Sequence, residues 1–251
     1  MKRLDLLEQF YEIGKKPKNY PNGYSDKTIK TLVTEFKRIE KEIMTTNPTL
    51  DGIHVHFSTG NSKIGEEPSV SLRTILDCGN CSKCKKVCYD LKDTIRNQYS
   101  RLNRVENYLI YKYQPERYFK EISNYVMLNY LDFFRWHIGG DIIDKQYYEG
   151  IKKVARDNPQ CNFLVYTKMY DLINEDYEEI ENLKIMFSVY EGIECSNQHN
   201  LPTFHIIDKE GNTTAEIEKP LLCGGNCVLC RRKKIGCNYA QIGECTVVAL
   251  H

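Results

Sequence analysis

The segment from Asp132 to Lys168 sets the architecture: it opens with D-F-F-R-W-H-I-G-G-D at 132–141 and closes with N-F-L-V-Y-T-K at 162–168. Both ends are rich in aromatic and β-branched residues, which predicts buried strands at 132–137 and 162–168. The residues from Asp144 to Asp157 between them predict a helix, with Asp144 as its N-cap. Strand, helix and strand in this order predict a βαβ unit, in which the two strands are parallel.

The same alternation continues on both sides of this unit. Residues 89–130 predict two helices divided near Gln114-Pro115, whose arginines and lysines form either a solvated surface or a nucleic-acid face. Further strands are predicted at 53–57, 70–76, 183–190 and 204–208. Strands that alternate with helices predict an α/β fold with a mainly parallel sheet.

Three regions follow along the chain. Residues 1–50 carry apolar side chains at helical spacing and predict a helical N-terminal cap. Residues 51–219 are expected to form the α/β core, and residues 220–251 a cysteine-rich C-terminal segment that packs on it.

Residues 77–89 read D-C-G-N-C-S-K-C-K-K-V-C-Y and hold four cysteines at the spacing C-x2-C-x2-C-x3-C: Cys78, Cys81, Cys84 and Cys88. This is the spacing of bacterial ferredoxin-type iron–sulfur ligation, with Tyr89 in place of the usual proline. Thiolates are soft ligands that suit iron–sulfur clusters, zinc or copper(I). Structural zinc usually takes two cysteine pairs with a longer spacer, so the run favours a cluster, with zinc or metal-free cysteines as alternatives.

A second group of cysteines lies near the C-terminus: Cys223, Cys227, Cys230, Cys237 and Cys245. We expect the first four to form a second ligand set, with Cys245 able to replace one of them. The core of this group is C-x3-C-x2-C, a spacing familiar from radical SAM enzymes, where three cysteines leave one iron open. Those enzymes carry it after the first barrel strand, whereas here it comes last.

Composition and charge restrict the class of protein. The formal net charge of +1 predicts no strong field toward nucleic acid or membrane. We expect no transmembrane helix and no signal peptide, because apolar runs are short and acidic residues interrupt the N-terminus. A cytoplasmic protein with 11 cysteines is expected to use them for metal or redox chemistry rather than for disulfides.

Several polar residues fall where strands are expected to end. The cysteine run, the Gly139-Gly140-Asp141 turn and Lys168 all follow predicted strands, and parallel α/β folds collect function at that edge. The turn is either a plain βα turn or a cofactor-binding turn whose carboxylate holds an amino group. Arg135 and His137 lie two apart and are expected to share one face, where a charge is costly unless paired. Lys168 is either a solvated strand end or a ligand anchor.

Taken in order, C-K-K-V-C-Y, F-R-W-H-I-G-G-D, F-L-V-Y-T-K and the C-terminal C-x2-C resemble the phage and bacterial gene product eighty-eight family. The resemblance covers residues 53–251 and leaves the helical N-terminus outside. That family is similar in outline to radical SAM enzymes. The resemblance therefore implies a partial (β/α) barrel, with a cluster loop after its first strand and a Gly-Gly-Glu-like motif after its second.

Carried over residue by residue, Cys84 and Cys88 match the first two cysteines of the radical SAM loop, with Tyr89 as their aromatic neighbour. Gly139, Gly140 and Asp141 match the motif that binds the amino group of SAM. The third cysteine position is Leu91, which departs from the pattern. If all four cysteines of the run bind one cubane, every iron is capped and SAM cannot chelate the cluster.

These observations predict an iron–sulfur protein with one or two [4Fe–4S] clusters and with SAM as a candidate cofactor. It would perform redox or radical chemistry at the barrel mouth, with Gly139 to Asp141 holding a cofactor and Arg135, His137 and Lys168 holding an anionic substrate. Its partner would be a small-molecule substrate or an electron donor. The alternatives are an electron-transfer protein, or a non-enzymatic iron–sulfur or zinc module that binds protein or nucleic acid, although the near-neutral charge counts against nucleic acid.

Overall fold

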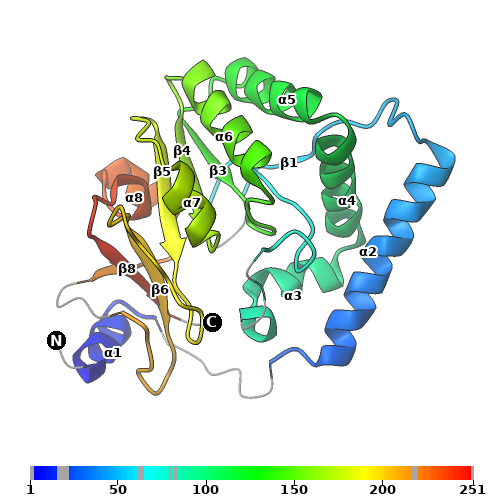
Figure 1. Cartoon of the computed structure of the whole chain (residues 1–251). Helices are drawn as coiled ribbons and strands as arrows, with labels where there is room; N and C mark the ends of the chain where they lie inside the picture. Colours follow the sequence, from blue (N-terminus) through cyan, green and yellow to red (C-terminus); the bar gives the residue numbers. More distant parts are fainter. Residues whose placement is uncertain are drawn as a thin grey trace.

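The computed structural model describes residues 3–15, 23–60, 65–79, 81, 84–215 and 220–249. Its centre is one eight-stranded sheet with the strand order β1-β2-β3-β4-β5-β6-β8-β7 (Figure 1). The strands are β1 (Phe57–Ser58), β2 (Ser69–Val70), β3 (Phe133–Trp136), β4 (Asn162–Thr167), β5 (Leu183–Ser188), β6 (Thr203–Ile207), β7 (Leu221–Cys223) and β8 (Cys245–Ala249).

Eight α-helices and two short 3-10 helices accompany the sheet in the described part of the chain. The α-helices are α1 (Arg3–Glu12), α2 (Asp26–Thr46), α3 (Tyr89–Arg96), α4 (Gln98–Tyr113), α5 (Pro115–Leu128), α6 (Lys145–Asp157), α7 (Tyr170–Asp176) and α8 (Cys227–Lys233). The 3-10 helices are η1 (Cys84–Val87) and η2 (Cys237–Tyr239). The predicted mixed α/β class is therefore confirmed.

The parallel strands follow one another in chain order. From β2 to β6 each strand pairs with the next, and only β1 is antiparallel to its neighbour. A doubly wound sheet would reverse its strand order at a switch point, and no such reversal occurs between β2 and β6. At the C-terminal end, β8 lies between β6 and β7. The described strands leave β1 and β7 as edges, so a barrel is not shown.

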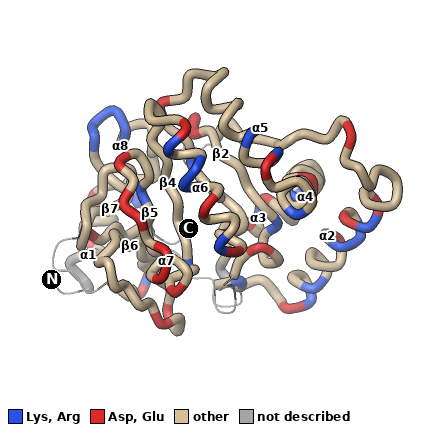
Figure 2. Tube along the Cα trace, turned by 45° about the horizontal axis from the view of Figure 1, so that its top comes forward, with Lys and Arg blue, Asp and Glu red and all other residues tan. Residues whose placement is uncertain are grey.

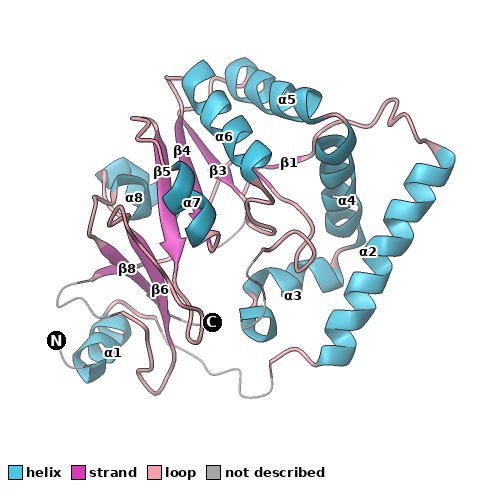
Figure 3. Ribbon diagram, in the orientation of Figure 1, coloured by secondary structure: helices cyan, strands magenta, loops and turns pink. Residues whose placement is uncertain are grey.

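The two faces of the sheet bury different residues, because side chains alternate along a strand. One face contributes Phe134, Trp136, Phe163, Val165 and Phe187 to the main hydrophobic core, together with residues of α2 and α4 to α7. The opposite face, called the inner face below, carries a smaller cluster of Phe133, Leu164, Met186 and Ala240. In Figure 3, α6 and α7 lie on one side of β4 and β5, and α8 lies on the other. The C-terminal segment therefore covers part of the inner face.

The two N-terminal helices contact different parts of the molecule. Leu6, Leu7 and Phe10 of α1 pack against Ile207, Cys245 and Val247 of the C-terminal strands. In contrast, α2 buries one side in the main core and lies beside α4 (Figure 1). The described residues of the N-terminal region thus contain two helices, which pack on different parts of the molecule.

Several predicted elements have different bounds. The helix at 144–157 is confirmed as α6, and the Asp144 side chain accepts the Tyr147 N–H at 2.8 Å. The region 89–130 forms three helices, because Asn97 caps α4 and adds a break before the one predicted at Gln114. The strand expected at 53–57 shrinks to β1, since the Val55 and His56 N–H groups donate to side chains, Glu121 and Asn107. The extended segment 70–76 shrinks to β2 and then turns at 74–77.

Over the described residues, no helix combines the length and the apolar character needed to cross a membrane.

Candidate functional site

A cavity of about 370 Å³ lies at the C-terminal ends of the parallel strands and along the inner face. This size falls within the roughly 300–1,000 Å³ typical of small-molecule sites. Eight cysteines, four from each group, line it: Cys78, Cys81, Cys84, Cys88, Cys223, Cys227, Cys230 and Cys237. Gly139, Gly140, Asp141, Arg135, His137 and Lys168 line it as well. The groups that follow the strand ends therefore border one cavity.

The first cysteine group occupies the loop between β2 and α3. The thiol of Cys81 contacts Cys78 and Cys84, and these hydrogen bonds raise the pKa of Cys81. The hydrogen bond between Cys81 and Cys84 and the positive charge of Lys168 lower the pKa of Cys84 to about 6, so this thiol ionises near neutral pH. Gly79 lets the loop approach α7, because an added Cβ would lie 2.0 Å from the Met169 sulfur. A thiolate with thiol neighbours is the kind of donor that a soft metal prefers.

The second cysteine group comes from β7, α8 and η2. Burial and the nearby Glu67 carboxylate raise the pKa of Cys227, and burial raises that of Cys237 to about 11. The thiols of Cys227, Cys230 and Cys237 all have Cys223 as an electrostatic neighbour. The thiols of the first group likewise interact with one another. The cavity therefore contains two separate sets of thiols.

The donor atoms fit a soft metal or a cluster by their chemistry, because all eight cysteines are free of disulfides. Within the described ranges, no three Cys, His, Asp or Glu side chains converge closely enough to hold a single metal ion. The thiols are therefore gathered around the cavity without forming a compact mononuclear site.

Cys245 does not line this cavity. It is 2% exposed and packs on the opposite face of β8, among residues of α1. Thr246 and Val248, the next residues of alternate orientation, face the cavity instead. Cys245, predicted as a replacement ligand, therefore lies outside the cavity that the other eight cysteines line.

Arg135 lies between the two cysteine groups. Its guanidinium carbon is 4.7 Å from the centre of the Tyr166 ring, and its Nε has no hydrogen-bond partner among the described residues. Burial opposes the charge, but Tyr89, Tyr166 and Cys227 outweigh it and raise the pKa of Arg135. The cavity wall therefore carries a permanent positive charge.

His137 departs from the expectation that it shares a face with Arg135. Its φ of 54° takes the backbone out of the strand conformation, and its Nε2 lies 2.9 Å from the Tyr147 hydroxyl on α6. Burial lowers the pKa of His137 to about 3, so the imidazole is neutral. Its Nδ1 has no partner in the described structure. A non-glycine residue at positive φ beside a cavity is typical of a functional position.

The Gly139-Gly140-Asp141 turn is fixed to the segment that leads into the first cysteine group. The Leu72 N–H donates to the Gly139 carbonyl at 2.9 Å, and the Asp141 N–H donates to the Asp77 carbonyl at 2.8 Å. The Asp141 carboxylate accepts the N–H groups of Ile142 and Lys168 at 2.7 and 2.9 Å. These bonds favour the plain-turn explanation, although Asp141 also faces the cavity.

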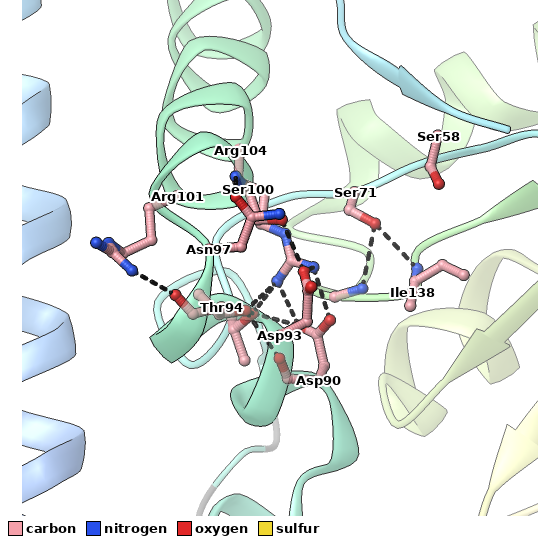
Figure 4. Close-up of polar contacts among 12 residues, drawn as sticks. Ser58, Ser71, Asp90, Asp93, Thr94, Asn97, Ser100, Arg101, Arg104 and Ile138 are labelled. Atoms are coloured by element: carbon pink, nitrogen blue, oxygen red, sulfur yellow. Dashed lines mark hydrogen bonds and ion pairs between the residues drawn. The ribbon is translucent and has the colours of Figure 1, made fainter. Parts of the chain in front are cut away.

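A buried polar network supports the same turn from below (Figure 4). Asp90 and Arg104 form an ion pair, with Nη2 to Oδ1 at 2.7 Å, and the side chains of Thr74 and Thr94 join them. A Cβ on Gly139 would lie 2.1 Å from the Asp90 carboxylate. Arg104 was expected on a solvated or nucleic-acid-binding helix face, but its side chain is 8% exposed. Its position in α4, one helix beyond the cysteine run, gave no signal of this role.

Glu67 is a site residue that the sequence did not indicate. It is fully buried, and within the described part of the chain neither carboxylate oxygen has a hydrogen-bond partner; the Arg231 Nε lies 3.8 Å away. Burial raises the pKa of Glu67, and its carboxylate lies beside Cys227. It lies in a polar loop before β2, and a polar loop predicts a surface position.

The fold and the cavity define a mixed α/β protein with a cavity lined by two sets of cysteines. A family model, Gene product 88, matches residues 34–220. The chain therefore belongs to the gene product 88 family. The match includes the first cysteine group and the Gly-Gly-Asp turn, and it ends before the second cysteine group, whereas the resemblance noted above ran to residue 251. No curated protein and no solved structure matches the chain.

Proposed function

We propose that the chain is an iron–sulfur protein that performs redox or radical chemistry on a small molecule bound in the cysteine-lined cavity. One observation carries the proposal: eight free thiols in two sets border the same cavity as Arg135 and Lys168. The first set, Cys78, Cys81, Cys84 and Cys88, and the second set, Cys223, Cys227, Cys230 and Cys237, would each hold a cluster. A [4Fe–4S] cluster would supply single electrons to a molecule bound beside it.

Two cationic side chains, Arg135 and Lys168, line the cavity beside the cysteines. Thiolates that bind a cluster would make the cavity negative, and Arg135 and Lys168 would offset that charge and attract an anionic substrate. His137, neutral and hydrogen-bonded to Tyr147, offers Nδ1 to a substrate at the mouth. Leu164, Phe204 and Ile206 make the remaining wall apolar, which limits water beside the reacting groups.

The first test is metal content after purification without oxygen. We expect iron and inorganic sulfide in equal amounts, near eight of each per chain for two clusters and near four for one. Electron paramagnetic resonance with and without SAM then tests for an open iron, since SAM binding to the cluster shifts the signal. Zinc without sulfide would overturn the proposal.

Matched cysteine variants show how much of the iron each set of cysteines binds. Cys84→Ser and Cys227→Ser are each expected to remove about half of the iron of a two-cluster protein. Cys195→Ser is the control, because Cys195 lies outside the cavity lining and packs against the main core. Equal iron in all three variants would contradict the assignment of ligands.

A second candidate function rests on the exposed basic residues of the C-terminal segment. Arg232, Lys233 and Lys234 are exposed at the end of α8, where Figure 2 shows a continuous basic stretch. A metal-stabilised module that binds nucleic acid would use such a stretch, and its affinity would fall steeply with salt. Binding of a single-stranded oligonucleotide that weakens at least tenfold between 50 and 200 mM salt, roughly the loss that several phosphate contacts give, would favour this candidate.

A further inference from the structure

The inner face of the cavity carries polar atoms that lack partners. Among the described residues, Arg135 Nε, Asn238 Oδ1 and Thr246 Oγ1 are buried and have no hydrogen bond, and all three residues line the cavity. Thr246 is 2% exposed, and its hydroxyl lies within hydrogen-bonding reach of the Cys237 sulfur, a weak acceptor. Native proteins rarely leave such atoms unpaired, so their concentration on one wall points to a bound polar group.

These three residues surround one point of the fold. The Cys237 thiol has Tyr166, Thr246 and Arg135 as electrostatic or hydrogen-bonding neighbours, and Asn238 follows it directly in η2. The Tyr166 and Phe204 rings meet edge to face with centroids 5.1 Å apart and form the adjacent apolar wall. We call the part of the cavity bounded by Arg135, Tyr166, Phe204, Asn238 and Thr246 the inner chamber.

Each wall of the inner chamber selects for a different part of a ligand. The Arg135 guanidinium is a cation whose planar donors match a carboxylate. The Asn238 carbonyl oxygen only accepts, so it requires an N–H or O–H on the ligand, whereas the Thr246 hydroxyl serves either role. The aromatic wall favours an apolar or aromatic body.

We propose that the inner chamber binds a small carboxylic acid that carries an amino or hydroxyl group and an apolar or aromatic body. This inference rests on the proposed function only in treating the cavity as the substrate site, because the three contacts are made by protein side chains. It names the class of molecule that would lie beside Cys237 in the cavity.

The test uses four probes of nearly equal size: L-phenylalanine, 3-phenyllactate, 3-phenylpropionate and phenethylamine. The first two carry both an anion and a donor, the third lacks the donor, and the fourth lacks the anion. Titration calorimetry under anaerobic conditions on the full chain, as purified, gives each dissociation constant. We expect L-phenylalanine or 3-phenyllactate to bind at least tenfold more tightly than the other two. Equal binding of 3-phenylpropionate would overturn the donor requirement, and no binding of any probe at millimolar concentration would overturn the ligand class.

Variants then place the ligand in the inner chamber. Arg135→Met is expected to weaken the best probe about 10- to 150-fold, and Thr246→Val about 2- to 10-fold, as the loss of a charged and a neutral hydrogen bond predicts. Thr246→Val keeps the volume of the side chain and removes an unpaired hydroxyl, so it is expected to fold. Arg232→Met, on the exposed end of α8, is the control and should bind like the unaltered chain. Unchanged affinity in Arg135→Met would place the probe elsewhere and overturn the proposal.

Iron and sulfide, measured on each sample, separate this inference from the proposed function. If the protein binds a probe but holds no cluster, the ligand site of the inner chamber is supported and the proposed redox function is wrong. If the protein holds full clusters but binds none of the four probes, the proposed redox function is supported and the ligand class is wrong.

Discussion

Two carboxylates of α3 interact with the same arginine in different surroundings. Asp90 is 2% exposed at its side chain and pairs with Arg104, whereas Asp93 is 57% exposed and lies 3.8 Å from the same guanidinium. A buried charge that loses its partner is strongly destabilising, while exposed ion pairs contribute little. The two positions therefore form a matched test of the network beneath the Gly-Gly-Asp turn.

We expect Asp90→Asn to lower the free energy of unfolding by about 3–5 kcal/mol, because Arg104 would be left buried and unpaired. Asp93→Asn is expected to cost about 1 kcal/mol or less. Urea denaturation of both variants measures the difference. Similar losses in the two variants would show that burial does not set the strength of this network.

His205 gives a prediction on pH dependence. Burial lowers its pKa from 6.5 to about 4, and its Nδ1 is 2.7 Å from the Thr214 hydroxyl. As the pH falls from 6.5 toward 4, the unfolded chain gains a proton at His205 that the folded chain does not accept. Stability therefore falls with decreasing pH across that window and is unaffected by this group above it.

The variant His205→Asn removes this titration while keeping a hydrogen-bonding side chain. Between pH 6.5 and 4, the unaltered chain should lose about 1.4 kcal/mol per pH unit more than the variant. Denaturant unfolding at several pH values makes the comparison. Stability curves that stay parallel throughout would mean that the imidazole is protonated in the folded protein.

At the level of single residues, the sequence predicted the groups whose meaning lies in local spacing. The cysteine spacings and Gly139-Gly140-Asp141 are recognisable without a fold, and the structure brings them to one cavity. Glu67, Asn238 and Thr246 have no such local signal, since their importance comes from contacts with residues far away in the chain. His137 was predicted in the site, but its positive φ, which turns it toward Tyr147, is a tertiary effect.

Among the described α-helices, α8 alone contributes no residue to the core. None of its residues is buried, and Arg231 is its main anchor, through the Asp132 carboxylate at 3.5 Å and the Phe133 ring at 5.0 Å. A short helix that buries so little is marginal on its own. If Cys227 and Cys230 bind a cluster, that cluster is the principal support of α8.

We therefore expect removal of metal by a chelator to release the C-terminal segment selectively. Amide hydrogen exchange should increase by at least tenfold at 224–239, while α4 and α5, which bury several residues in the main core, keep their protection. Uniform loss of protection would mean that metal supports the whole fold. Unchanged exchange in every segment would mean that the thiols do not bind metal.

The strands show where sequence patterns were sufficient and where they were not. Long buried strands such as β4 and β5 were predicted within two residues, because their apolar runs decide them. The strand expected at 53–57 failed because Glu121 and Asn107 take its backbone donors, which no local pattern reveals. The strand β8 was missed because Cys245 was assigned to the metal-binding pattern, whereas Cys245 and Val247 alternate with Thr246 and Val248 as in any strand.

Over the whole molecule, the two ends of the described chain support each other. Phe10 of α1 is fully buried against β6 and β8, and Cys245 on the same patch is 2% exposed. Cys161 is equally buried but belongs to the main core. The two thiols therefore report separately on the α1 contact and on the rest of the fold.

We expect Phe10→Ala to cost about 3–5 kcal/mol in the free energy of unfolding. It should also make Cys245 react faster with a thiol reagent, with Cys161 unchanged, as measured by mass spectrometry of labelled peptides. Equal acceleration at both cysteines would mean that opening is global and that α1 is part of one cooperative unit.

The position of β8 has a consequence for biosynthesis. Among the described strands β7 pairs with β8 alone and β8 joins it to β6, so the wall that carries Cys223 and Thr246 is added only after residues 245–249 have been synthesised. At about 5–20 residues per second, the cysteines of the first group wait roughly 8 to 35 s between their own synthesis and the closing of the site. During that interval a nascent chain exposes four thiols to oxidants and to competing metal ions. If the thiols hold a cluster as proposed, anaerobic growth or a dedicated metal donor would therefore change the yield of correctly assembled protein more than the stability of the finished fold.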